Sequence, residues 1–451
     1  MQEGMVQRLI NLFNNAFAQL GVQVELVALE DLAVLIYKGM SVQARNYHNL
    51  DHVFSLVDEE TPILTLAALF HDLVYCQVDL GFLPEIRAII SPYIAEKDGQ
   101  IFISEEAGRG EKNVQVALQT FDFSPGQLLN PFSGLNEFLS ALVMVKKLEK
   151  FLDERDLLGL LLCVEASIPF RESAVTGEDH FYVLEKRALA IDRAWRLGIT
   201  TDEVQAAVKQ AVIFANRDVD SFAETDVSSY LETTWKLLPE TNLYLRSIEM
   251  YSIREYRQAL QAMSTTMSWL KAERVFHQYR GLPPDAEYQR MVAQARQNIE
   301  TAKQYLKIKL LTQAILEALA EVTGGDAPLS LFMGDLPHDG NRPRRLEDYL
   351  PEFRIPERVD TVSPVFYLLS DQRSLDSSFD LYTAPLALFV FSSLTPSEML
   401  ELSSVAADMF EGRVKAEEFL SAIKPGVLSP IASACAKMAF TRREQLKRFV
   451  G

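Results

Sequence analysis

Residues 45–53 read RNYHNLDHV, and residues 66–75, after a polar turn, read LAALFHDLVY. The whole chain has 6 histidines, and His48, His52 and His71 all fall within this short window. The second segment is almost wholly apolar up to Phe70, which predicts a buried helix that ends in a His-Asp pair. A carboxylate buried without a partner is costly. A bound divalent cation is the simplest way to compensate it.

The two segments are predicted to form consecutive helices. His48 and His52 are four residues apart, so we expect them one turn apart on the same helical face. Imidazole nitrogens combined with carboxylate oxygens suit manganese, iron, magnesium, cobalt or zinc better than an ion that prefers thiolates. A catalytic site needs about three or four protein ligands. His52, His71 and Asp72 would supply three of them.

The order of these residues resembles the HD superfamily of metal-dependent phosphohydrolases, whose pattern is one His, an adjacent His-Asp pair and a distant Asp. The chain is most similar to members that open with a segment like YHNLDH at residues 47–52, among them cyclic-nucleotide phosphodiesterases and a group of uncharacterised bacterial phosphohydrolases. The resemblance implies that His52, His71 and Asp72 bind the metal and that His48 donates a proton to the leaving oxygen. It covers only the first half of the chain.

The distant Asp of that pattern has to come from further along the sequence. Asp218 is the first choice because it ends an apolar helical segment, much as the last Asp of the family does. Asp220 and Glu165 are the alternatives. Glu165 is a lone acid in an apolar helix, and we expect it to support a metal ligand rather than bind the ion. Asp79, just past the His-Asp helix, is given the same role, with a surface carboxylate as the alternative.

Three arginines are candidates for binding the phosphate of a substrate. Arg45 lies beside the first His segment, Arg171 follows a helix-ending proline, and Arg217 precedes Asp218. A guanidinium group suits phosphate because it can donate two parallel hydrogen bonds. A structural salt bridge is the alternative for each of them.

Composition and charge narrow the classes of function. The chain has 451 residues, of which 48% are hydrophobic and 24% charged, as is typical of globular proteins. A net charge of -18 disfavours general binding to nucleic acid or to an anionic membrane. We expect no signal peptide or membrane span. Cys76, Cys163 and Cys435 are far apart, which favours a reducing cytoplasm over disulfides or a thiolate metal site.

The predicted fold class is all-α, because strands are scarce in the pattern. The length predicts two or three domains. We place an HD-type phosphohydrolase domain at residues 1–255, a long helical connector at 256–325 and a second helical domain, without a chemical motif, at 326–451. The long helix expected from Asp285 to about Thr323 could dock on the catalytic domain or on a second subunit, so a homo-oligomer is compatible with the sequence.

The expected function is metal-dependent hydrolysis of a phosphate ester, with a nucleotide or other small phosphorylated metabolite as substrate. We expect one divalent metal ion, with a second ion bridged through water left open. Asp72 or Asp218 would orient the attacking water. The alternative is a regulatory or scaffold protein that retains the helical domain with weak or no activity and acts through its C-terminal half.

Overall fold

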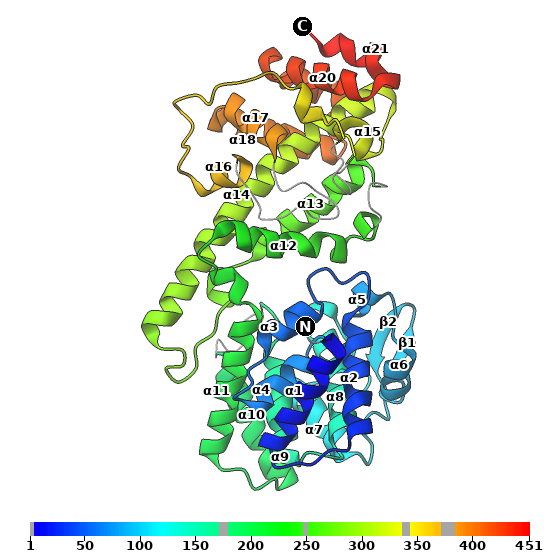
Figure 1. The fold of residues 1–451 in the computed structure, drawn as a ribbon, viewed down its shortest axis with the longest axis vertical. Helices are drawn as coiled ribbons and strands as arrows, with labels where there is room; N and C mark the ends of the chain where they lie inside the picture. Colours follow the sequence, from blue (N-terminus) through cyan, green and yellow to red (C-terminus); the bar gives the residue numbers. More distant parts are fainter. Residues whose placement is uncertain (1–3, 171–178, 247–250, 336–342, 371–383) are drawn as a thin grey trace. The chain divides into compact units, whose positions relative to one another are not determined.

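The computed structural model describes residues 4–170, 179–246, 251–335, 343–370 and 384–451 (Figure 1). Within these residues the protein is all-α apart from one two-stranded sheet, which confirms the predicted fold class. The HD-type assignment stays a prediction.

By the contacts between its residues the chain divides into two compact units. The first consists of Met1–Asp220 and Lys271–Ala293, and the second of Ser221–Leu270 and Gln294–Gly451. The chain therefore leaves the first unit, builds part of the second, and returns. The predicted functional domains at 1–255, 256–325 and 326–451 stay a prediction, because this division concerns contacts and not activity.

The first unit contains eleven of the α-helices and both strands among its described residues. They are α1 (Met5–Gln19), α2 (Leu26–Met40), α3 (Leu50–Leu56), α4 (Pro62–Phe70), α5 (Cys76–Asp79), α6 (Pro84–Ile90), β1 (Ile94–Lys97), β2 (Gln100–Ile103), α7 (Lys112–Phe121), α8 (Leu135–Leu148), α9 (Glu154–Ala166), α10 (His180–Trp195) and α11 (Thr201–Asp218).

Helix α4 lies in the core of the first unit. Every residue from Ile63 to Phe70 is buried, as its unbroken apolar sequence predicts. The helix packs against α1, α3, α8 and α9, and α9 in turn packs against α7, α8 and α11. Because these helices enclose α4 on several sides, they fix the position of the His-Asp pair that follows it.

A β-hairpin replaces part of an expected helix. The sequence predicts a helix from Pro84 to Ile94, but α6 ends at Ile90 and strand β1 begins at Ile94. Strands β1 and β2 pair antiparallel, with Lys97 opposite Gln100. The two residues between them, Asp98 and Gly99, both have positive φ angles (52° and 74°). An Asp-Gly pair in this conformation is a favoured hairpin turn.

The returning segment Lys271–Ala293 belongs to the first unit. Tyr279 is buried in the core of that unit, and its hydroxyl group donates to a carboxylate oxygen of Glu185 in α10 at 2.7 Å. Arg280 forms an ion pair with the same carboxylate at 3.0 Å. These contacts hold the segment on α10.

The second unit is built around the later part of α14 (Asp285–Gly324), whose first residues belong to the first unit. In the second unit, the residues of α14 contribute to two apolar clusters, one with Trp235 and Tyr305 and one with Leu319 and Phe419. Its other α-helices are α12 (Val227–Thr241), α13 (Ile253–Trp269), α15 (Leu329–Met333), α16 (Pro364–Ser370), α17 (Pro385–Ser393), α18 (Pro396–Phe410), α19 (Ala416–Ala422), α20 (Pro425–Met438) and α21 (Arg443–Leu446).

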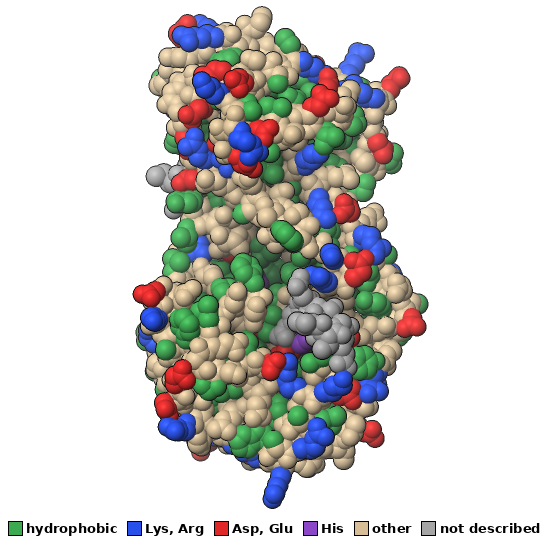
Figure 2. Space-filling view, turned by 180° about the vertical axis from the view of Figure 1, so that it is seen from behind, with side chains coloured by type: hydrophobic (Ala, Val, Ile, Leu, Met, Phe, Trp, Pro, Cys, Tyr) green, Lys and Arg blue, Asp and Glu red, His purple; other side chains and the backbone are tan. Residues whose placement is uncertain are grey.

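Short 3₁₀ segments connect several of these helices. They are η1 (Pro131–Ser133), η2 (Asp220–Ala223), η3 (Leu243–Arg246), η4 (Ala272–Arg274), η5 (Leu346–Tyr349), η6 (Phe440–Arg442) and η7 (Lys447–Phe449). Among the described residues, no helix combines the length and the apolar character that crossing a membrane requires. On the face drawn in Figure 2, acidic and basic side chains are interspersed with hydrophobic ones on the surface of each unit.

Candidate metal centre

His52 lies in the first turn of α3, and Asn49 sets the start of that helix. The side-chain oxygen of Asn49 accepts hydrogen bonds from the backbone N–H groups of Asp51 (2.9 Å) and His52 (3.3 Å), as an N-cap residue does. Because the helix begins only at Leu50, His48 lies outside it. The expectation that His48 and His52 share one helical face is therefore wrong, although their ring centroids are only 5.7 Å apart.

His71 follows α4 directly and is oriented by the last turn of that helix. Its ring Nδ1 atom lies 3.0 Å from the carbonyl oxygen of Ala68. Because a carbonyl oxygen only accepts, this contact places the proton of the neutral ring on Nδ1 and leaves a lone pair on Nε2. Histidines that bind metals are commonly oriented by such a backbone contact.

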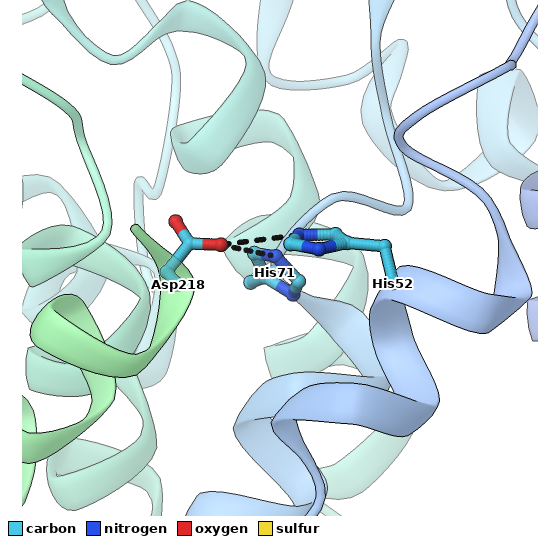
Figure 3. Close-up of side chains that lie close together, drawn as sticks. All are labelled: His52, His71 and Asp218. Carbon is cyan, nitrogen blue, oxygen red and sulfur yellow. Dashed lines mark ion pairs between the residues drawn. The ribbon is translucent and has the colours of Figure 1, made fainter. Parts of the chain in front are cut away.

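Asp218, the last residue of α11, meets both imidazoles (Figure 3). Its Oδ1 atom lies 3.1 Å from Nε2 of His52 and 3.5 Å from Nε2 of His71. Asp72 approaches the same two nitrogens, with its Oδ2 atom 3.0 Å from His71 and 3.6 Å from His52. Ligand atoms of His52, His71 and Asp218 all lie within 4.8 Å of one another, close enough to share a metal ion. The structure thus brings together the four side chains that the sequence predicts as metal ligands.

The two Nε2 atoms have no hydrogen bond within the described part of the chain, although both are buried. Carboxylate oxygens lie near them, 3.1 Å from Nε2 of His52 and 3.0 Å from Nε2 of His71. A buried polar atom without a partner costs about 1–3 kcal/mol. Two imidazole nitrogens and two carboxylates facing one another in this way are the ligands that a divalent cation binds. The residues present therefore fit a metal ion.

The acids change the protonation of the two imidazoles when no cation is bound. Burial lowers the pKa of His52, but the nearby carboxylates of Asp218 and Asp72 outweigh burial and raise it to about 9. The same balance of burial and acids raises the pKa of His71 well above its ordinary value. Burial raises the pKa of Asp218, but the imidazoles dominate and lower it to about 2. A cation that binds here must displace protons from the rings.

His48, the predicted proton donor, lies beside this cluster between two tyrosines. Its ring packs edge-on against Tyr75 and Tyr47, with centroid distances of 4.8 and 4.7 Å. Tyr47 also contacts the ring of His52 at 4.8 Å. Sequence analysis overlooked both tyrosines, although each lies within one of the two motifs.

Arg45 is predicted to bind a substrate phosphate, but its side chain contacts other groups of the protein. Its side chain is fully buried and forms a two-pronged ion pair with Asp79, at 2.8 and 2.6 Å. The guanidinium group also donates to the backbone carbonyl of Asp72 at 2.7 Å. Its further acceptors are the carbonyls of His48 and Leu73 and the sulfur of Met40.

These acceptors engage the whole donor set of Arg45, which is the structural alternative considered for it, and its contact with a substrate phosphate stays a prediction. The group connects the His48 loop to the His-Asp turn. Asp79 forms its ion pair with Arg45, and its predicted role of supporting a metal ligand stays a prediction.

Arg217 and Arg171 are the other two arginines predicted to bind a substrate phosphate. Arg217 is half-buried and pairs with Asp58 at 3.0 Å, and it also donates to the carbonyl of Leu56 at 3.1 Å. These bonds are the structural alternative considered for it. Arg171 lies outside the described residues.

Glu165 is completely buried and belongs to a separate cluster. Its two oxygens lie 3.0 Å from Nε2 of His180 and 3.1 Å from Arg187. Arg187 also donates to the carbonyl of Thr120 at 2.6 Å. Of the three acids considered for the distant ligand, Asp218 is the one that reaches the imidazoles of His52 and His71. Sequence analysis missed Arg187, because nothing in its own helix marks it as a partner of Glu165.

Comparison of the chain with models of protein families, with curated proteins and with solved structures finds no match.

Proposed function

We propose that this protein hydrolyses phosphate esters with the help of a divalent metal ion, and that its substrate is a nucleotide or another small phosphorylated metabolite. The observation that carries the proposal is the pair of buried Nε2 atoms on His52 and His71, which lie 3.0–3.6 Å from the carboxylates of Asp72 and Asp218 without making hydrogen bonds in the described chain. The resemblance of this residue order to the HD superfamily supports the same function.

The four side chains would hold one ion, and the two carboxylates would balance its two positive charges. Manganese, iron, magnesium, cobalt and zinc are all compatible with mixed nitrogen and oxygen ligands. When bound, such an ion polarises a phosphoryl group and lowers the pKa of water. A second ion bridged through water is left open.

The chain's own residues would handle the protons. His48 would protonate the departing ester oxygen, a role that suits imidazole because it gains and loses a proton near neutral pH. The edge-on packing of Tyr47 and Tyr75 limits the movement of its ring. Asp72 or Asp218 would orient the attacking water and accept its proton. Arg45 would keep the His48 loop and the His-Asp turn in register.

The test combines metal analysis with turnover. The purified protein would be analysed for bound metal and then assayed on a panel of phosphate mono- and diesters with added manganese. We expect hydrolysis that disappears in His48→Ala while that variant still binds manganese. His180→Ala is the matched control, because it also removes an imidazole beside a buried acid but lies outside the cluster; it should retain turnover.

Two outcomes would count against the proposal in different ways. Bound metal with no turnover of any ester would favour the regulatory or scaffold role. A protein that binds no divalent ion would overturn the metal site itself.

A further inference from the structure

Asp218 occupies a difficult position for a metal ligand, because it is the last residue of α11. The carbonyl groups of the final helical turn lack hydrogen-bond partners within the helix. The end of a helix is therefore its least restrained part. A metal ligand, by contrast, has to be held within about 0.5 Å of its productive position. Other contacts must therefore restrain the end of α11.

Arg217 provides one of these contacts. Its guanidinium group donates to the carbonyl oxygen of Leu56, the last residue of α3, at 3.1 Å and to the carboxylate of Asp58 at 3.0 Å. Because α3 also carries His52, this bond ties the helix end that bears one ligand to the helix that bears another.

Asn216 provides the second contact, in a different direction. Its side-chain N–H donates to the carbonyl oxygen of His277 at 2.8 Å, and its side-chain oxygen accepts the backbone N–H of His277 at 2.8 Å. The amide thus satisfies both backbone groups of one residue and is itself buried. His277 belongs to the returning segment Lys271–Ala293, which is far from α11 in the sequence but part of the same unit.

We propose that Asn216 and Arg217 are positioning residues that fix the carboxylate of Asp218, and that the returning segment Lys271–Ala293 is therefore part of the support of the metal centre. Three consecutive side chains point to three different elements: Asn216 to the returning segment, Arg217 to the end of α3, and Asp218 to the imidazoles. The inference rests on the proposed function, because it assumes that Asp218 binds the ion.

The test measures manganese affinity in the full chain, together with the melting temperature of the metal-free protein. Asn216→Ala should weaken manganese binding by about tenfold, the lower end of the effect of residues that support metal ligands. Tyr279→Phe is the matched control, because it removes a bond that holds the same segment to α10 and not to α11. It should lower the melting temperature but leave manganese affinity within about twofold, well below the effect of a supporting residue.

Asp58→Asn tests the contact of Arg217 by changing its partner, so that no residue of α11 is altered. It should also weaken manganese binding, and it keeps the question answerable if Asn216→Ala does not fold. Unchanged affinity in both variants, or an equal loss in Tyr279→Phe, would overturn the positioning role. If the unmodified protein binds no divalent ion, the proposed function fails and the inference fails with it.

Discussion

Two buried clusters in the first unit combine histidine with carboxylate, and they are satisfied in different ways. In the Glu165 cluster each carboxylate oxygen accepts a directed hydrogen bond, one from Arg187 at 3.1 Å and one shared with His180 at 3.0 Å. In the Asp218 cluster the acids lie equally close to the rings, but the Nε2 atoms of His52 and His71 make no hydrogen bond within the described chain.

The difference shows what separates a structural ion pair from a candidate metal site. Burial and the presence of histidine are common to both clusters, so neither feature is diagnostic. A structural cluster pairs its donors and acceptors directly, whereas the Asp218 cluster directs its nitrogen and oxygen atoms toward a shared region.

The largest expected effect is the loss of a ligand from the Asp218 cluster. Asp218→Asn should reduce manganese affinity by more than about 100-fold, the upper end of the effect of residues that only support a ligand. Isothermal titration with manganese measures it, and hydrolysis should fall to the background rate. Asp220→Asn is the control, because it removes an acid two residues away; an equal loss there would contradict the assignment.

The metal candidates were predictable from the sequence to different degrees. His52, His71 and Asp72 lie close together in the chain, so their residue types and order were enough to group them. Asp218 is far away in the sequence, and it was chosen through the resemblance to the HD superfamily. The position of Arg45 was not predictable, because its ion pair with Asp79 depends on how separate loops pack.

In the fold, too, features set by local sequence were predictable, and features set by contacts between distant residues were not. The unbroken apolar run before the His-Asp pair predicted the buried helix α4. The hairpin of β1 and β2 was overlooked, although Asp98-Gly99 is a strong turn signal. The return of Lys271–Ala293 to the first unit had no local signal, because it depends on contacts such as those between Tyr279 and Glu185.

The next effect is expected in the other cluster and concerns stability alone. Glu165→Ala leaves Arg187 and His180 without their shared carboxylate, and losing one partner of a buried ion pair costs about 3 kcal/mol or more of unfolding free energy. Urea denaturation measures the change. Manganese affinity of the folded variant should equal that of the unmodified protein. A selective loss of metal binding with little change in stability would show instead that Glu165 supports the metal ligands.

A pH effect should distinguish the metal-free from the metal-bound Asp218 cluster. The folded-state pKa of His52 is raised from 6.5 to about 9, so its contribution to stability is present below pH 6.5 and is lost as pH rises through 9. We expect the metal-free protein to lose on the order of 2 kcal/mol over this range. The lowered pKa of Asp218 acts at the other end, where stability falls as pH drops from 3.8 through about 2.

Urea denaturation of chelator-treated protein between pH 6 and 9 measures the loss at the alkaline end. Saturating manganese should remove it, because the ion requires unprotonated rings and so binds more tightly as pH rises. If His52→Gln kept the full pH dependence, the effect would belong to other groups.

The smallest expected effect lies at the exposed edge of the Glu165 cluster and tests how far that cluster extends. Arg187 also approaches Asp122 at 3.4 Å, but the Asp122 side chain is 81% exposed. Exposed ion pairs contribute little because water screens them, so Asp122→Asn should change the free energy of unfolding by less than about 0.5 kcal/mol. Asn is the appropriate replacement because Asp122 has a positive φ of 58°, a conformation that Asn tolerates as well as Asp does. The substitution therefore removes the charge without straining the turn after α7. A loss comparable with that of Glu165→Ala in the same urea experiment would contradict this reasoning, because it would mean that the surface carboxylate and the buried one act as a single unit on Arg187.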